Sequence, residues 1–194
     1  MDHTMFENLL AHIKRYISLS DEEEKKLLPY LTYKELKKKE HVLKEGKVCT
    51  ANHFIIKGCL RMYSLTENGT EQIVQFGIEN WWITDYMSLD TQKPGQFSIQ
   101  AIEPSAIVIL HKNTQDELFR KIPKLERYFR LVLQRAYAAS VMRVKYIFTE
   151  SGEERFRQFT NSFPEFVQRV PQYMLASYLG FTPEFLSKIR AKKN

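Results

Sequence analysis

The spacing of apolar residues changes twice along the chain. In the first forty residues they recur at helical intervals: Phe6, Leu9, Leu10, Ile13 and Ile17. Between His41 and His111, short runs rich in β-branched and aromatic residues alternate with glycine-containing turns, which predicts an antiparallel barrel or sandwich. After Lys112 the pattern is helical again. This order of elements predicts an α+β fold.

Three shorter segments carry more specific signals. Ser20, followed by Glu23 in "SDEEEKKLL", is the pattern of a capping box and predicts a helix start. The charged stretch "YKELKKKEH" is interpreted as a solvated face that leads into the strands. "NWWITDYMSLD" interrupts the β-region and is predicted to be a loop with a short helix lying against the barrel.

The region after the strands predicts one long helix. Asn113 is a candidate cap for a short helix through Phe119, and Pro123 can open a helix that runs to about residue 148. Its apolar positions approximate an a/d seam, interrupted by Arg135: Leu125, Tyr128, Val132, Ala139, Met142 and Tyr146. A partner helix in a symmetric dimer would cover such a seam. Packing against its own barrel is the alternative.

The polar, glycine-containing segment "TESGEE", residues 149–154, follows the long helix and predicts a hinge. Gly152 is interpreted there as a residue that takes backbone angles which other residues avoid. The predicted domains are therefore residues 1–148, which hold the β-region, the N-terminal helices and a dimerisation helix over about 123–148, and residues 149–194.

The last domain contains "MLASYLGFTPEFLSKIR", residues 174–190, which predicts two helices crossing at a tight turn. Ala176 allows the two helices to approach closely, and Gly180 tolerates the positive φ of the turn. Thr182 is a natural N-cap, and Pro183 suits the first helical position. Together these features predict a helix-turn-helix that reads double-stranded DNA in the major groove.

The exposed start of the second helix supplies the candidate reading residues. Glu184 can accept a hydrogen bond from cytosine, and Lys188 can donate one to guanine or to phosphate. The predicted DNA-binding residues are Gln172, Thr182, Pro183, Glu184, Ser187, Lys188, Arg190 and Lys192. From Gln168 to the end there are five basic residues and one acidic residue. A structural helical hairpin with a solvated basic tail is the alternative.

Composition narrows the class of protein. The chain has 194 residues, 43% of them hydrophobic, and a net charge of +6 with a pI near 9.2, which moderately favours an anionic partner. The N-terminus lacks the pattern of a secretory signal, and no apolar run is long enough to cross a membrane. Cys49 and Cys59 have neither the spacing of a zinc site nor that of a disulfide framework, so a cytoplasmic protein is expected.

Three stretches resemble the Crp/Fnr family of bacterial transcription regulators: "FIIKGCLRMYSLTENGTEQIVQF", "SGEERFRQF" and "VPQYMLASYLGFTPEFLSKIR". The resemblance implies a double-stranded β-roll of the cyclic-nucleotide-binding type, a long dimerisation helix and a C-terminal winged helix, which binds a palindromic operator as a homodimer. RNA polymerase is a candidate further partner. Little sequence follows the second helix, so the wing is expected to be short or absent. Pro183 and Lys188 stand where family members often carry arginine, so the operator is expected to differ.

The resemblance also bears on the effector. Members that bind cyclic AMP hold its phosphate with a Gly-Glu pair and an Arg-Ser/Thr pair, but "WWITDYMSLDTQKPGQFSIQA" contains no arginine. Cyclic AMP is therefore not expected, and the N-terminal region lacks the cysteines of an iron–sulfur cluster. An unidentified small molecule is expected near Trp82, Asp85, Tyr86 and Met87. In the alternative, a constitutive regulator, aromatic side chains fill the roll: Phe76, Trp81, Trp82 and Phe97.

A different class of function is a cupin-like metal-binding protein or enzyme with a structural helical tail. That chemistry needs a close pair of histidines and a carboxylate, but His41, His53 and His111 are twelve and fifty-eight residues apart. Haem binding through one of these histidines is an alternative that the sequence leaves open. There is no phosphate-binding loop and no nucleophile elbow. The chain is therefore expected to be neither an enzyme nor a holder of a metal site.

Overall fold

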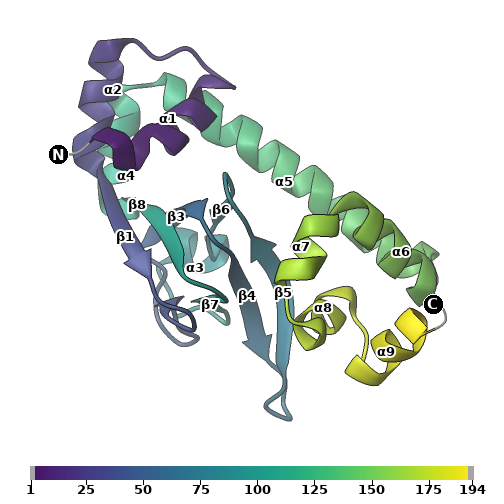
Figure 1. The fold of residues 1–194 in the computed structure, drawn as a ribbon. Helices are drawn as coiled ribbons and strands as arrows, with labels where there is room; N and C mark the ends of the chain where they lie inside the picture. Colours follow the sequence, from purple (N-terminus) through teal and green to yellow (C-terminus); the bar gives the residue numbers. More distant parts are fainter. Residues whose placement is uncertain (1–2, 192–194) are drawn as a thin grey trace. The chain divides into compact units, whose positions relative to one another are not determined.

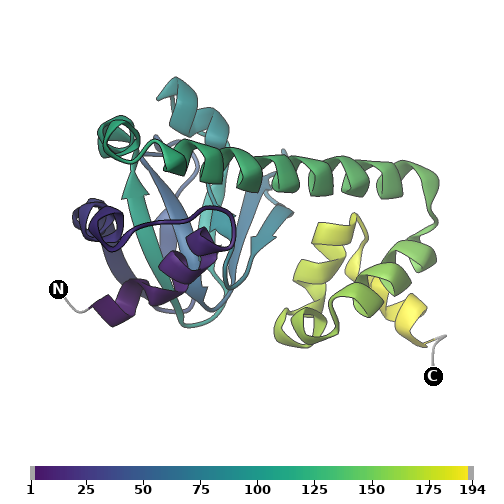
Figure 2. The ribbon, with the colours of Figure 1, turned by 90° about the horizontal axis from the view of Figure 1, so that it is seen from above.

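The structure, a computed structural model, describes residues 3–191 and forms two compact units (Figures 1 and 2). The first contains the residues up to Ser64 together with Gln75–Leu133. The second contains Leu65–Val74 and the residues from Gln134 onward. The division falls inside helix α5 (Lys124–Thr149), whereas the predicted domain boundary lies after residue 148.

The strands form two antiparallel four-stranded sheets, which confirms the predicted β-roll (Figure 1). One sheet has the order β1-β8-β3-β6: β1 is Leu31–Leu36, β8 Ser105–His111, β3 Ala51–Lys57 and β6 Trp82–Ile83. The other has the order β2-β7-β4-β5: β2 is His41–Leu43, β7 Ser98–Ala101, β4 Leu60–Leu65 and β5 Glu71–Gly77. Strand β8 is almost wholly buried between its neighbours, as its apolar sequence "AIVIL" requires.

The position of β1 corrects one interpretation of the sequence. Part of the charged stretch "YKELKKKEH" is strand rather than a solvated face alone, because β1 pairs along its whole length with β8. Leu31 and Leu36 at its ends are buried, while Lys34 and Glu35 between them face solvent. The strand lies at the edge of its sheet, where charged side chains are tolerated.

Helices precede and follow the strands: η1 (His3–Phe6), α1 (Glu7–Lys14), α2 (Asp21–Leu27), η2 (Leu28–Tyr30), α3 (Tyr86–Thr91) and α4 (Lys112–Lys121). The predicted capping box is confirmed: Ser20 Oγ accepts from the Glu23 N–H, and the Glu23 carboxylate accepts from the Ser20 N–H. Helix α3 is the short helix predicted within the β-region. The predicted cap at Asn113 is wrong, because α4 begins at Lys112, directly after β8, without a side-chain cap.

The remaining helices belong to the second unit: α6 (Gly152–Ser162), α7 (Pro164–Arg169), α8 (Gln172–Leu179) and α9 (Pro183–Ala191). All strands of the described residues precede Lys112. Within residues 3–191, none of the helices is both long and apolar enough to span a bilayer.

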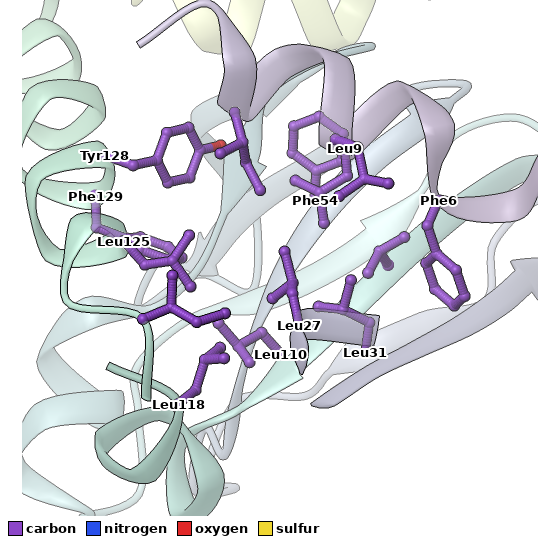
Figure 3. Close-up of a cluster of buried hydrophobic side chains, with 14 of the residues drawn as sticks. Phe6, Leu9, Leu27, Leu31, Phe54, Leu110, Leu118, Leu125, Tyr128 and Phe129 are labelled. Atoms are coloured by element: carbon purple, nitrogen blue, oxygen red, sulfur yellow. The ribbon is translucent and has the colours of Figure 1, made fainter. Parts of the chain in front are cut away.

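Helix α5 is one uninterrupted helix, but its environment changes along its length (Figure 2). Leu125, Tyr128 and Phe129 lie in a core with side chains from α1, α4 and the sheets (Figure 3). The first part of the predicted seam therefore packs against the helix's own roll, and its assignment to a dimer interface is wrong. Further along, the large exposed apolar residues are Leu133, Tyr137, Val141, Met142, Val144, Ile147 and Phe148.

The hydroxyl of Tyr128 joins three elements inside this core. It accepts a hydrogen bond from Trp82 Nε1 at 2.8 Å and lies 2.8 Å from Nδ1 of His12. All three side chains are buried, and burial raises the pKa of the Tyr128 hydroxyl well above its ordinary value. Because the hydroxyl is protonated, it can donate to His12 while it accepts from Trp82. The network fixes the start of α5 to α1 and β6.

Replacing Tyr128 with phenylalanine is expected to lower the free energy of unfolding by about 2 kcal/mol, because it removes the acceptor of the buried Trp82 indole N–H and the contact with His12 Nδ1. Urea denaturation measures the effect. Tyr173→Phe, at a side chain that is 54% exposed, is the matched control and is expected to change little. A loss in Tyr128→Phe no larger than in the control would contradict a structural role for the hydroxyl.

Candidate nucleic-acid interface and effector region

Helices α8 and α9 cross at a tight turn, as predicted. Gly180 has φ 76°, a left-handed conformation that suits glycine, and the Phe181 N–H donates to the Ala176 carbonyl at 2.9 Å. Ala176 is fully buried, as the close approach of the two helices requires. A small core holds the pair together, made of Phe156, Leu175, Ala176, Leu179, Leu186 and Ile189. This geometry is that of a helix-turn-helix.

The start of α9 is built as the sequence predicted. Thr182 Oγ1 accepts a hydrogen bond from the Phe185 N–H at 3.2 Å and so caps the helix, while Pro183 is its first residue. Glu184 lies in the first turn, where its own backbone N–H, together with Thr182, holds the pKa of its carboxyl below the ordinary value. Glu184 is therefore an anionic acceptor near neutral pH.

The structure places most of the predicted DNA-binding residues on the solvent side of this motif. Seven of them are exposed: Gln172, Thr182, Pro183, Glu184, Ser187, Lys188 and Arg190. Glu184 and Lys188 are one helical turn apart and lie on the same side of α9. Leu186 and Ile189 on the other side are buried. Lys192 lies outside the described residues.

Gln172 and Arg190 have a further feature in common. Both line a partly open pocket of about 370 Å³, whose lining also includes Phe156 and Leu175. Gln172 is the first residue of α8 and Arg190 is near the end of α9, so the pocket brings these two predicted contacts together. Backbone N–H groups at the start of α8 and the guanidinium of Arg190 are both suitable for a phosphate oxygen.

Gly152 has a different role from the predicted one. Its φ is not in the left-handed region, and it is the first residue of α6, capped by Ser151. A Cβ at this position would lie 2.6 Å from Cε1 of Phe185 and 3.2 Å from Cε1 of Phe181. Glycine is needed here because the aromatic side chains of α9 and the turn pack directly against the start of α6. The sequence pattern gave no reason to single out Phe185.

The four predicted effector residues do not form one group. Trp82 lies in the core beside α5, and Met87 is 74% exposed. Asp85 is buried: its Oδ1 accepts from the Ser88 N–H, and its Oδ2 is without a hydrogen-bond partner. A Cβ on Gly95 would lie 2.2 Å from this Oδ2, so a glycine there leaves room for the carboxylate. Tyr86 is 40% exposed as a whole residue, but desolvation of its hydroxyl raises the pKa of that group to about 12, which keeps it neutral.

The aromatic side chains that would fill the roll of a constitutive regulator are also divided. Phe76 and Trp82 are buried, and Phe97 is partly buried, but Trp81 is 45% exposed. Trp82 points its indole N–H at Tyr128 of α5. Trp81 therefore does not fill the interior.

The three histidines considered for a metal do not converge on one site. His41 Nε2 lies 3.0 Å from the Tyr63 hydroxyl, and His53 Nδ1 lies 3.3 Å from the Ile83 carbonyl. Burial lowers the pKa of His53 to about 4. His111 is exposed at the end of β8. Among the described residues, no three His, Cys, Asp or Glu side chains are grouped as metal ligands would be.

Comparison with known proteins agrees with this architecture. Residues 33–121 match the family model of the cyclic nucleotide-binding domain. The fumarate and nitrate reduction regulatory protein of Vibrio cholerae is 24% identical over 169 residues, covering 80% of this chain and 66% of that protein. A solved transcriptional regulator assigned to the Crp/Fnr family, from Eubacterium rectale, superimposes with a TM-score of 0.71 at 15% identity, covering 92% of this chain and 87% of the other. The chain is thus similar to Crp/Fnr regulators, and its β-roll matches the cyclic nucleotide-binding domain.

One solved regulator with a similar fold is described as c-di-GMP responsive. The global regulator CLP of Xanthomonas campestris superimposes with a TM-score of 0.74 at 10% identity, covering 89% of this chain and 91% of the other. The curated relatives are longer proteins, of which the matched part of this chain spans about two thirds.

The contact between Gly152 and Phe185 is testable by a double-mutant cycle. Gly152→Ala is expected to destabilise the protein by about 1 kcal/mol, because the new methyl group collides with the Phe185 ring. In a Phe185→Ala background the same change is expected to cost much less, because only the contact of the new methyl group with Phe181 Cε1 at 3.2 Å remains. Urea denaturation of the four proteins measures the coupling. Equal effects in both backgrounds would show that the ring does not enforce the glycine.

Proposed function

We propose that this protein is a DNA-binding transcriptional regulator that binds a palindromic operator as a homodimer. The observation that carries the proposal is the arrangement of α9: Glu184, Ser187 and Lys188 are exposed, while Leu186 and Ile189 anchor the helix from the other side. A helix with this division can enter the major groove without unfolding its own core. Relatives named as a transcriptional activator and as anaerobic regulatory proteins support this class of function.

Each exposed residue has a chemically suited partner on DNA. Glu184 can accept from the amino group of cytosine, and Lys188 can donate to guanine or to phosphate. Thr182, Ser187 and Arg190, with Gln172 at the start of α8, are suited to backbone contacts that fix register. Pro183 is the first residue of α9 and is proposed to lie beside the DNA as part of the capped first turn. Lys192 is proposed as a further phosphate contact on the basis of its charge alone.

The proposed dimer uses the exposed part of α5. Tyr137, Val141, Val144 and Phe148 follow one another at spacings of four, three and four residues, which places them along one side of the helix. Tyr137 and Phe148 are 73% and 82% exposed. A continuous apolar stripe of this kind is unusual on the free surface of a soluble protein and is suited to a second copy of the same helix.

An unidentified small-molecule effector is proposed to bind near Asp85 and Tyr86. Asp85 offers one buried carboxylate oxygen that is without a partner, and the neutral hydroxyl of Tyr86 can donate or accept. These groups suit a ligand with hydrogen-bond donors. The phosphate of cyclic AMP would meet a carboxylate here without an arginine in residues 81–101 to balance it, so cyclic AMP is disfavoured.

The proposed role also implies where the protein acts. A regulator that reads operators works in the cytoplasm beside the chromosome, and RNA polymerase is the partner through which it would change transcription. No catalytic role is proposed for any side chain.

Selection of duplexes from a random pool, followed by fluorescence anisotropy, tests DNA binding. The wild-type protein is expected to select a palindrome and to lose affinity steeply with salt, with a log–log slope of about −0.9 for each phosphate neutralised. Lys188→Ala is expected to weaken binding about tenfold. If Lys188 contacts guanine, the variant is expected to lose its preference at one base pair. If Lys188 contacts phosphate, the variant is expected to bind all sequences more weakly to the same extent, and its salt slope is expected to be smaller by about one.

Lys25→Ala removes the same charge from α2 and is the control for this experiment. Equal loss in the two variants would mean that only net charge matters. Equal binding of the selected and scrambled duplexes by the wild-type protein would refute the proposed function.

The dimer interface is tested by placing a charge on either side of α5. Phe148→Glu is expected to convert the dimer into a monomer at micromolar concentration, because it would bury an unpaired carboxylate in the stripe. Ala139→Glu, on the opposite side of the helix and within the originally predicted seam, is expected to leave the dimer intact. Sedimentation velocity measures both. A monomer formed by Ala139→Glu alone would favour the face that contains Met142 and Tyr146.

A further inference from the structure

A cluster of hydrogen bonds within the second unit ties the first helix of the helix-turn-helix to the edge of a strand. β5 is the last strand of its sheet, so backbone groups along its outer edge lack a neighbouring strand. Ser177 of α8 takes that place: its Oγ accepts from the Ile73 N–H at 2.9 Å and donates to the Glu71 carbonyl at 3.0 Å. A single hydroxyl thus satisfies a donor and an acceptor of the strand edge.

Two further side chains strengthen this contact. Gln72 Nε2 donates to the Ser177 carbonyl at 2.5 Å, so both the backbone and the side chain of Ser177 are held. Arg143, from the second half of α5, donates through Nη2 to the Tyr178 carbonyl at 2.8 Å and through Nη1 to the Val74 carbonyl. Its guanidinium also lies 4.0 Å from the centre of the Tyr178 ring. One arginine therefore links α5, α8 and β5.

The segment of β5 involved is held in place by its own turn. Thr66 and Thr70 close the loop between β4 and β5 through a backbone bond of 2.9 Å, and the Gly69 N–H donates to the Thr66 carbonyl at 2.8 Å. Ile73 is buried. Residues 71–74 are thus an ordered platform rather than a loose loop, and contacts to them can define the position of α8.

The contacts leave the proposed DNA-reading surface free. Glu184, Ser187 and Lys188 on α9 are exposed in the same structure in which Ser177 and Arg143 are engaged. An arrangement that blocked operator binding would be expected to cover these side chains. The cluster is therefore compatible with binding and can orient the helix-turn-helix relative to the half of α5 that carries the apolar stripe.

We propose that Ser177 and Arg143 are positioning residues, which hold each helix-turn-helix against α5 and β5 so that both copies in a dimer engage a palindrome at once. The inference rests on the proposed function. Bivalent binding depends on the effective concentration of the second reading helix at its half-site, and that concentration falls when the helix is free to swing. Binding of one helix-turn-helix to one half-site does not depend on the position of the other.

The experiment compares two duplexes, the palindrome selected by the wild-type protein and the same duplex with one half-site scrambled. Ser177→Ala and Arg143→Lys are each expected to raise the Kd for the palindrome about fivefold, the size expected for losing a net hydrogen bond or two. The Kd for the single half-site is expected to stay within about twofold. Arg143→Lys keeps the charge, so a change in general electrostatic attraction does not account for its effect.

Ser162→Ala, at an exposed serine on α6, is the matched control and is expected to leave both Kd values unchanged. Gln72→Ala removes only the bond to the Ser177 carbonyl, and its exposed side chain makes unfolding of the variant unexpected. Its effect on the Kd for the palindrome is expected to be in the same direction and smaller. Sedimentation checks that the variants remain dimeric. Amide exchange at Ile73 is expected to be faster in Ser177→Ala than in the wild-type protein, since the hydroxyl that accepts its N–H is gone.

Three results would overturn the inference. Unchanged palindrome binding would show that the contacts do not position the motif, and tighter binding would show that they hold it in an unfavourable orientation. Equal weakening on the palindrome and the half-site would indicate local damage to the helix-turn-helix. Failure of the wild-type protein to select any duplex would refute the proposed function as well. This outcome is distinct from the other three because it is measured on the wild-type protein alone.

Discussion

The buried hydroxyl of Tyr128 is the interaction on which the rest of the architecture depends. It fixes the beginning of α5 between Trp82 and His12, and the helix then continues without interruption to Thr149. Buried hydrogen bonds and packed aromatic side chains therefore fix the first turns of this helix in the core. Beyond Leu133 the apolar side chains of the same helix are exposed, and these are the ones proposed to meet a second copy.

The parts of the fold that could be predicted from the sequence are those whose interacting residues are close in the chain. The capping box of Ser20 and Glu23, the positive φ at Gly180 and the cap at Thr182 each involve a few consecutive residues with strong intrinsic preferences. The β-roll followed from repeated short strands and from the family resemblance. Strand β1 was missed because an edge strand carries charged side chains that read as a surface segment.

Features that depend on distant residues could not be predicted in the same way. Helix α5 has apolar residues on more than one side, and only the packing of the roll decides that Leu125 and Tyr128 face inward. The sequence marks Gly152 as a special position, but the need for glycine there comes from the ring of Phe185, thirty-three residues away. Ser177 is an ordinary helical serine in sequence, and its role arises from the edge of β5, more than a hundred residues earlier.

The helix-turn-helix is held at two places, and these explain why its reading surface stays free. The C-terminal part of α8 is bound at Ser177 and Tyr178, and the start of α9 packs through Phe185 on Gly152. Gly180 lies between these two attachments and supplies the bend. The attachments and the small core occupy other faces of the two helices, which leaves the side of α9 with Glu184 and Lys188 in contact with solvent. A motif held in this way loses little orientational freedom when it meets DNA, so that more of the energy of its contacts is available for affinity and discrimination between sequences.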